Sequence, residues 1–138
     1  MPDLMKMLVP GKPEYVRTVR MTAASIASDA GFDIEAIEDI KVAVSEACNN
    51  TVVHARESHI KDYSVEFERA EEKLTITVTD SGPGYDTDAY EEPEIEELRS
   101  GGLGLFIIKA LMDEVDIMSE PGVGTNIRMI KYLVRDIV

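Results

Sequence analysis

Apolar and polar positions change their period several times along the chain, and each change marks an expected element. A short apolar stretch over residues 4–9 is followed by Pro and Gly, which is typical of a first strand. Apolar residues then recur at helical spacing over residues 13–30, with Pro in the first position and Gly31 placed to end the helix. A second helical pattern begins at Asp33, a favourable N-cap residue, and runs to about residue 55. Its expected core stripe consists of Ile37, Ile40, Val44, Ala47, Thr51 and Ala55.

The second half of the chain predicts mostly strands. Residues 63–68 and 74–79 both alternate between apolar and polar side chains, and we interpret them as a hairpin. Residues 81–102 break every periodicity and contain Gly, Pro and an acidic run, so a long loop is expected there. A helix over residues 103–112 and strands over 115–119 and 125–133, with a Pro and Gly turn between the strands, are then predicted.

This order of elements indicates a fold class. Because the first two helices follow each other and the strands come in hairpins, we expect an α+β two-layer sandwich, a mixed β-sheet with helices on one face. Strict alternation of strands and helices, which a doubly wound fold requires, is absent. The 138 residues have the size of a single domain over positions 1–138, and with no Trp its core should be aliphatic.

Charge and composition restrict the partners. Fourteen Lys and Arg against 27 Asp and Glu give a net charge of -13, which disfavours direct binding of nucleic acid. The acidic surface favours either a basic protein partner or solubility alone. No apolar run is long enough for a membrane span, and the first 13 residues lack the layout of a signal peptide. The single cysteine, Cys48, is typical of a buried apolar position in a reducing compartment, so a cytoplasmic location is expected.

Glu46 is the only charged residue between positions 42 and 53 of the second helix. At about 100° per residue, Asn50 lies one turn above it, and Val42 and Val53 lie beside it, so this face should not be a solvated one. A carboxylate there needs a partner. Either a structural salt bridge or a bound ligand satisfies this need, and the amide oxygen of Asn50 suits Mg²⁺.

Two glycine-rich segments are the other candidate features. Asp80, Gly82 and Gly84 follow the point where a strand ends, and such glycines let a flat ligand approach while a carboxylate accepts from an exocyclic amine. An ordinary Asp and Gly turn is the alternative. Residues 99–105 form a glycine turn that opens into an apolar helix, an arrangement that favours phosphate, although a plain helix start also fits. Arg99 either reaches a terminal phosphate or offsets the acidic run.

These three features, in this order, resemble the ATP-binding fold shared by gyrase-type ATPases and histidine kinases. Within that fold the chain is closely similar to the bacterial anti-sigma-factor serine kinases. The likeness covers nearly the whole chain. The stretches that carry it are Pro13-Glu14-Tyr15-Val16, Ile37-Glu38-Asp39-Ile40-Lys41, Val44-Ser45-Glu46-Ala47-Cys48, Gly101-Gly102-Leu103-Gly104-Leu105 and Leu111-Met112-Asp113-Glu114-Val115.

The resemblance implies ATP and Mg²⁺ as cofactors and a role for each candidate residue. It implies that Asn50 binds Mg²⁺, that Asp80 holds the adenine amino group and that Glu46 is the catalytic base. Arg99 is expected to assist at the terminal phosphate. The remaining nucleotide contacts are implied for Gly82, Gly84, Gly101, Gly102, Leu103, Gly104 and Thr125. The segment between residues 84 and 101 is short and acidic for a lid of this family.

The candidate base also indicates the acceptor. A serine hydroxyl needs a positioned carboxylate, whereas a neutral imidazole is already nucleophilic, so Glu46 favours a hydroxyl acceptor. The resemblance then implies a regulator that binds an RNA polymerase sigma factor and phosphorylates an anti-anti-sigma factor on serine. It also implies a homodimer, which the apolar strand over residues 4–9 favours. The alternatives are an ATP-gated protein-binding module without kinase activity and a stand-alone histidine-kinase-type ATPase domain.

Overall fold

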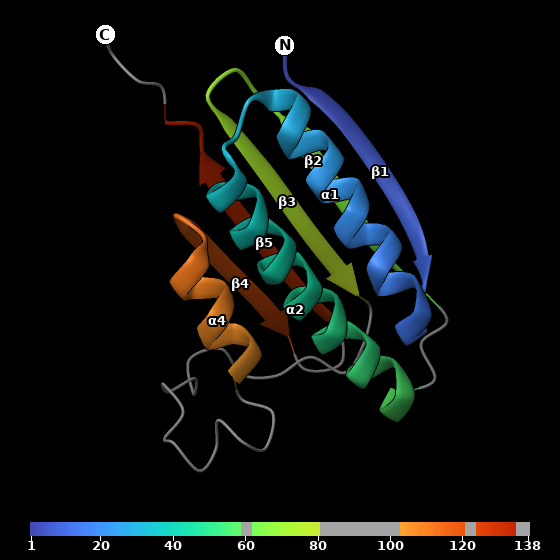
Figure 1. Cartoon of the computed structure of the whole chain (residues 1–138). Coiled ribbons are helices and arrows are strands. Elements are labelled where there is room, and N and C mark those ends of the chain that lie inside the picture. The colour runs from blue at the N-terminus through green and yellow to red at the C-terminus, as the bar shows by residue number, and fades with distance from the viewer. Residues whose placement is uncertain (59–61, 81–102, 121–123, 135–138) are drawn as a thin grey trace, which may run out of the picture.

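A computed structural model of the chain describes residues 1–58, 62–80, 103–120 and 124–134, which form a sheet and a layer of helices (Figure 1). Each predicted strand is present, one or two residues longer or shifted at its ends. The strands are β1 (Asp3–Pro10), β2 (Asp62–Arg69), β3 (Lys73–Asp80), β4 (Glu114–Glu120) and β5 (Gly124–Tyr132). The predicted hairpin is the β2–β3 pair, in which Ser64 lies opposite Thr79.

Three described helices, α1 (Val16–Ala30), α2 (Ile34–Ser58) and α4 (Leu103–Leu111), cover one face of the sheet (Figure 1). A short 3-10 turn at Pro13–Tyr15 leads into α1. Gly31 ends α1 with a φ of 100°, a left-handed conformation that glycine adopts without a steric penalty. The Asp33 carboxylate then accepts a hydrogen bond of 2.8 Å from the Ala36 amide, which confirms the predicted N-cap of α2. Among the described helices, none has the length and apolar character that crossing a bilayer requires.

The strand order is β1-β2-β3-β5-β4, and every described pair is antiparallel. The expectation of a mixed sheet is therefore wrong for these strands. The reason lies in the connection through α4: β4 returns parallel to β3, but β5 inserts between them and pairs with both. The α+β two-layer architecture with helices on one face is confirmed.

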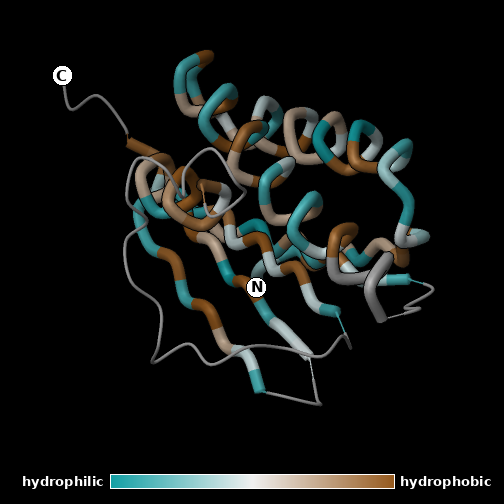
Figure 2. The backbone as a smooth tube through the Cα atoms, turned by 90° about the horizontal axis from the view of Figure 1, so that it is seen from below, coloured by the Kyte–Doolittle hydropathy of each residue, from teal (hydrophilic) through white to brown (hydrophobic). Residues whose placement is uncertain are grey.

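The core lies between the two layers, as the brown inner positions of the tube in Figure 2 show. Alternate residues of each strand face the helices, because successive side chains of a strand point to opposite faces. The core is mostly aliphatic, as predicted, with Tyr63 and Phe67 of β2 as its largest fully buried side chains. The other face of the sheet carries no described helix and bears exposed Leu4, Leu8 and Met118.

Candidate functional site

Glu46 of α2 and Gly104 of α4 meet where the two helices pack together. A Cβ atom built on Gly104 would lie 3.1 Å from Oε2 of Glu46 and 4.0 Å from its Cβ. Gly104 lies in the first turn of α4, so the carboxylate is next to the N-terminal end of that helix. A side chain at position 104 would occupy the space that Glu46 uses, and glycine leaves that space open.

The surroundings of Glu46 distinguish between the two interpretations of its charge. Glu46 is half-buried, and it forms no ion pair with any cation in the part of the chain that the structure describes. A structural salt bridge to a described residue is therefore excluded. The neighbouring valines were expected to be withdrawn from solvent, but Val42 and Val53 are 42% and 53% exposed. That expectation was wrong, because this helix face looks away from the sheet, and the core is instead filled by Ala43, Val44, Ala47 and Cys48.

Asn50 lies one helical turn beyond Glu46, and the nitrogen of its side-chain amide lacks a hydrogen-bond partner among the described residues. This Nδ2 atom is also buried. A buried polar group without a partner costs about 1–3 kcal/mol, so native proteins rarely retain one unless a ligand or water completes it. Asn50 is therefore a position where a bound polar ligand would satisfy an existing need. The described residues contain no cluster of three or more His, Cys, Asp or Glu side chains that could hold a metal alone.

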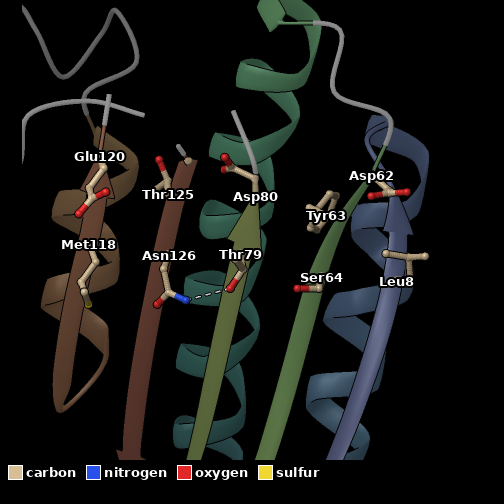
Figure 3. A pocket seen from close by; sticks show the side chains of 11 residues that line it. Leu8, Asp62, Tyr63, Ser64, Thr79, Asp80, Met118, Glu120, Thr125 and Asn126 are labelled. Carbon is tan, nitrogen blue, oxygen red and sulfur yellow. Dashed lines mark hydrogen bonds between the residues drawn. The ribbon is translucent and has the colours of Figure 1, made fainter. Parts of the chain in front are cut away.

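Asp80 and Thr125 lie opposite each other at the ends of β3 and β5, as Figure 3 shows. Both are buried, with exposed fractions of 6% and 3%, although their side chains are polar. Thr51 of α2 places its hydroxyl 3.3 Å from Oδ2 of Asp80 and also 3.3 Å from the Ala47 carbonyl, which share its single proton. The Asp80 carboxylate is thereby tied to the same helix that carries Glu46 and Asn50.

Thr125 is held by a second hydroxyl. The Ser119 and Thr125 hydroxyls are 2.9 Å apart across the β4–β5 pair, and the Ser119 hydroxyl also donates to the Gly124 carbonyl at 3.3 Å. These contacts fix the side chain of Thr125 beside Asp80. Sequence reasoning missed Thr51 and Ser119. For Thr51 the available signal was a hydroxyl within an otherwise apolar helix stripe, which was interpreted as part of the core.

A hollow of about 500 Å³ crosses the strand ends, and Asp80 and Thr125 are part of its lining. Its lining includes Leu8, Thr79, Met118 and Asn126, and Asn126 Nδ2 donates to the Thr79 hydroxyl at 2.9 Å (Figure 3). These four side chains alternate along their strands with residues that face the helices. The hollow therefore reaches the helix-free face, while Asp80 and Thr125 border it at the strand ends.

The structure thus connects several of the candidate residues. Glu46 on α2 lies against Gly104 near the start of α4, and Thr51, the residue after Asn50, contacts Asp80, which lies opposite Thr125. The start of α4 and the end of β3 lie at the same end of the fold (Figure 1). Leu103 begins α4 and is half-buried. The other predicted site residues, namely Gly82, Gly84, Arg99, Gly101 and Gly102, lie outside the described residues.

Comparison with known proteins gives the same picture over nearly the whole chain. The family described as "Histidine kinase-like ATPase domain" matches residues 9–131. The serine-protein kinase RsbW of Halalkalibacterium halodurans is 41% identical over 143 residues, covering 98% of this chain and 86% of that protein. The serine-protein kinase RsbW of Bacillus subtilis is 39% identical over 140 residues, covering 95% and 86% respectively.

Two solved structures share the fold. The crystal structure of the RsbU and RsbW domains of a Mycobacterium tuberculosis protein aligns with a TM-score of 0.70 at 23% identity, over 97% of this chain and 33% of that one. The histidine kinase domain of a blue-light activated kinase from Erythrobacter litoralis aligns with a TM-score of 0.52 at 21% identity, over 90% and 61%. With identity near 40% to the RsbW proteins over almost its full length, the chain belongs to the RsbW family of serine-protein kinases, on a histidine kinase-like ATPase domain.

Proposed function

We propose that the chain binds Mg-ATP between α2, the end of β3 and the start of α4, and phosphorylates a serine of another protein. One observation carries this proposal: a half-buried carboxylate, without a cation among the described residues, lies against a glycine in the first turn of a helix. A helix N-terminus favours anionic ligands such as phosphate. A base and a phosphate site side by side are what phosphoryl transfer to a hydroxyl requires.

The other residues of the site have proposed roles that fit their surroundings. The Asn50 side chain has a role for both of its polar atoms: its oxygen would bind Mg²⁺, and its nitrogen, which lacks a hydrogen-bond partner among the described residues, would donate to the ligand. Asp80, held by Thr51, accepts a hydrogen bond from the adenine amino group, and Thr125 assists beside it. When bound, Mg-ATP supplies the phosphoryl group and the charge of the metal. The residues proposed for the base pocket, the phosphates and the terminal phosphate are Gly82, Gly84, Gly101, Gly102, Leu103, Gly104 and Arg99.

Glu46 is the proposed general base. Its carboxylate accepts the proton of the serine hydroxyl as the oxygen attacks, which a residue of this type does when it is placed within hydrogen-bond reach. A histidine acceptor needs no such base. The relatives named as serine-protein kinases support the serine acceptor over the stand-alone histidine-kinase alternative.

The proposed protein partners are an RNA polymerase sigma factor, which the chain binds, and an anti-anti-sigma factor, which it phosphorylates on serine. This regulation of transcription would take place in the cytoplasm, where sigma factors act. The net charge of -13 supports partners that present basic surfaces.

The proposal is tested with purified protein, labelled ATP and candidate anti-anti-sigma proteins, comparing the wild type with Glu46→Gln. Glutamine keeps the shape of glutamate but accepts no proton, so transfer should fall about 10² to 10⁴-fold while Mg-ATP affinity and sigma-factor capture change little. Transfer at the wild-type rate would remove Glu46 from the mechanism. Nucleotide-dependent sigma capture without any phosphoserine product would instead favour the ATP-gated binding module.

We also propose that the protein is a homodimer. β1 is an edge strand, and Leu4 and Leu8, 63% and 72% exposed, lie on the helix-free face. Between these leucines the Lys6 ammonium lies 3.8 Å from a carboxylate oxygen of Glu66. This pairing lowers the free-energy cost of desolvating the lysine when a second subunit covers the face. Light scattering at micromolar concentration should give twice the monomer mass, and Leu8→Lys should shift it toward the monomer. A wild-type monomer would contradict the dimer.

A further inference from the structure

Lys131 is the penultimate residue of β5, and its side chain connects β5 with α2 and with the end of α4. Its Nζ atom donates a hydrogen bond of 2.6 Å to the carbonyl of Leu111, the last residue of α4. The same atom lies 3.6 Å from Oδ2 of Asp39 on α2 and 4.0 Å from Oδ1 of Asp113, just after α4. The lysine side chain is only 14% exposed. We call these four residues the lysine clamp.

The clamp is physically well matched to the end of α4. The C-terminal carbonyls of a helix carry partial negative charge and lack partners within the helix, so a cation there is favourable. An ammonium group this far from water is costly unless it is paired, and the two carboxylates pair it. Asp113 also accepts a hydrogen bond of 2.7 Å from the Tyr132 amide, so the clamp is anchored to the backbone of β5.

The clamp and the proposed active site lie at opposite ends of the same short helix. α4 has nine residues, about 13 Å at 1.5 Å per residue, and Gly104 near its other end lies against Glu46. Asp39 and Glu46 both belong to α2, about two turns apart. The two helices pack against each other, and the clamp and the contact between Glu46 and Gly104 connect them near opposite ends of α4.

From this arrangement we propose that Lys131 is a positioning residue for phosphoryl transfer: it holds α4 at the angle at which its N-terminal end and Glu46 meet the phosphates. This inference rests on the proposed function. It also gives a role to two stretches that the nucleotide contacts leave unexplained, residues 37–41 and 111–115, because each supplies one carboxylate of the clamp.

The test compares Lys131→Met, which keeps the aliphatic stem, with Lys131→Arg, which keeps the charge. Calorimetry measures ATP and AMP affinity, and single-turnover assays measure transfer to an anti-anti-sigma serine. Lys131→Met should weaken ATP binding about fivefold and slow transfer about tenfold, while AMP affinity changes less than about twofold, because the proposed site places the distal phosphates at α4. Lys131→Arg should restore most of both losses. Lys41→Met, which removes an exposed pair with Glu38 at 3.1 Å on α2, is the matched control and should change neither.

The outcomes separate a positioning role from a merely structural one. Equal losses of ATP and AMP affinity, or no loss of either, would overturn the inference while the proposed function stands. If Lys131→Met does not fold, Asp39→Asn is the second variant: it leaves the bond to Leu111 intact and should weaken ATP binding about twofold without affecting AMP. A wild-type protein that binds no ATP would overturn the proposed function and this inference together.

Discussion

The Glu46 carboxylate of α2 lies so close to Gly104 of α4 that a Cβ atom at position 104 would stand 3.1 Å from its Oε2 atom. Gly104→Ala should therefore move the carboxylate by a few tenths of an ångström, since it is the free end of a flexible side chain. We expect phosphoryl transfer to fall about tenfold, because catalytic groups are sensitive to small displacements. The free energy of unfolding should change by less than about 1 kcal/mol, because alanine gains helix propensity. Single-turnover transfer and urea unfolding measure the two effects.

Gly31→Ala provides the matched control for this variant. Gly31 has a φ of 100°, and a Cβ atom added there would have no neighbour within 4 Å, so alanine is strained at this position but displaces nothing. It should cost about 1 kcal/mol of stability and leave transfer unchanged. If Gly104→Ala transferred phosphate at the wild-type rate, the contact between the two residues would have no part in catalysis.

Asn50 and Asp80 should respond differently to magnesium. Asn50→Ala should remove most of the difference in ATP affinity between Mg²⁺ and EDTA, because it removes the proposed protein ligand of the metal. Asp80→Asn should instead lower ATP affinity more than about tenfold with or without metal, since it removes the carboxylate that we propose as the acceptor of the adenine amine. Calorimetric titrations in both buffers make the comparison. Unchanged ATP binding in both variants would refute the assignment of the nucleotide site.

Thr51→Val tests the hydroxyl that supports Asp80. Valine has a similar shape but cannot donate to Oδ2 of Asp80, so ATP affinity should fall about threefold to tenfold and the effect of Mg²⁺ should persist. Thr22→Val is the control, because the Thr22 hydroxyl makes the same backward bond to a helix carbonyl, at 2.8 Å to Thr18, and donates to no carboxylate of the described residues. Equal effects of the two substitutions would show that Thr51 acts only through its helix.

Stability should fall at alkaline pH because of Cys48 and Tyr63. Burial raises the pKa of the Cys48 thiol from 9.0 to about 12, although the nearby Tyr63 hydroxyl lowers it somewhat. Burial, followed by the neighbouring Cys48, likewise raises the pKa of Tyr63. Above pH 9 the unfolded chain releases the thiol proton while the folded chain keeps it, so Cys48 lowers the free energy of unfolding by about 1.4 kcal/mol per pH unit as pH rises from 9 to 12. Tyr63 adds to this fall only above its ordinary pKa of 10.0.

Urea unfolding of the wild type and Cys48→Ala at pH 8.0, 9.0 and 10.0 measures this slope, since the alanine variant should lose the part that begins near pH 9. The same burial should protect the thiol from alkylation until the protein unfolds. An equal slope in the two proteins, or rapid labelling of the folded wild type, would show that Cys48 keeps an ordinary pKa.

The local pattern was sufficient to predict the elements. Helical spacing, Gly31 and the Asp33 cap located the first two helices, and the alternation of β2 and β3 located the hairpin, because these signals act through neighbours in the sequence. The relative direction of neighbouring strands was not predicted correctly. It depends on the order of the strands in the sheet, where β5 pairs with both β3 and β4, and this order is decided by contacts between distant segments. The exposure of Val42 and Val53 was missed for a similar reason, since a helical wheel gives the angle of a face but not what covers it.

Glu46, Asn50, Asp80 and Gly104 could be proposed as site residues from sequence because each stands out locally, as a polar residue on an apolar helix face, a carboxylate at a strand end or a glycine at a helix start. Their distances were not encoded in any single segment. Only tertiary packing decided that Gly104 meets Glu46, that Thr51 supports Asp80 and that Lys131 gathers Asp39 and Asp113. Such contacts join residues that are far apart in the chain, so they exist only after the helices have packed on the sheet. The physical reason is one of range: hydrogen bonds and ion pairs act over a few ångströms, whereas sequence patterns determine directly only the conformation of neighbouring residues.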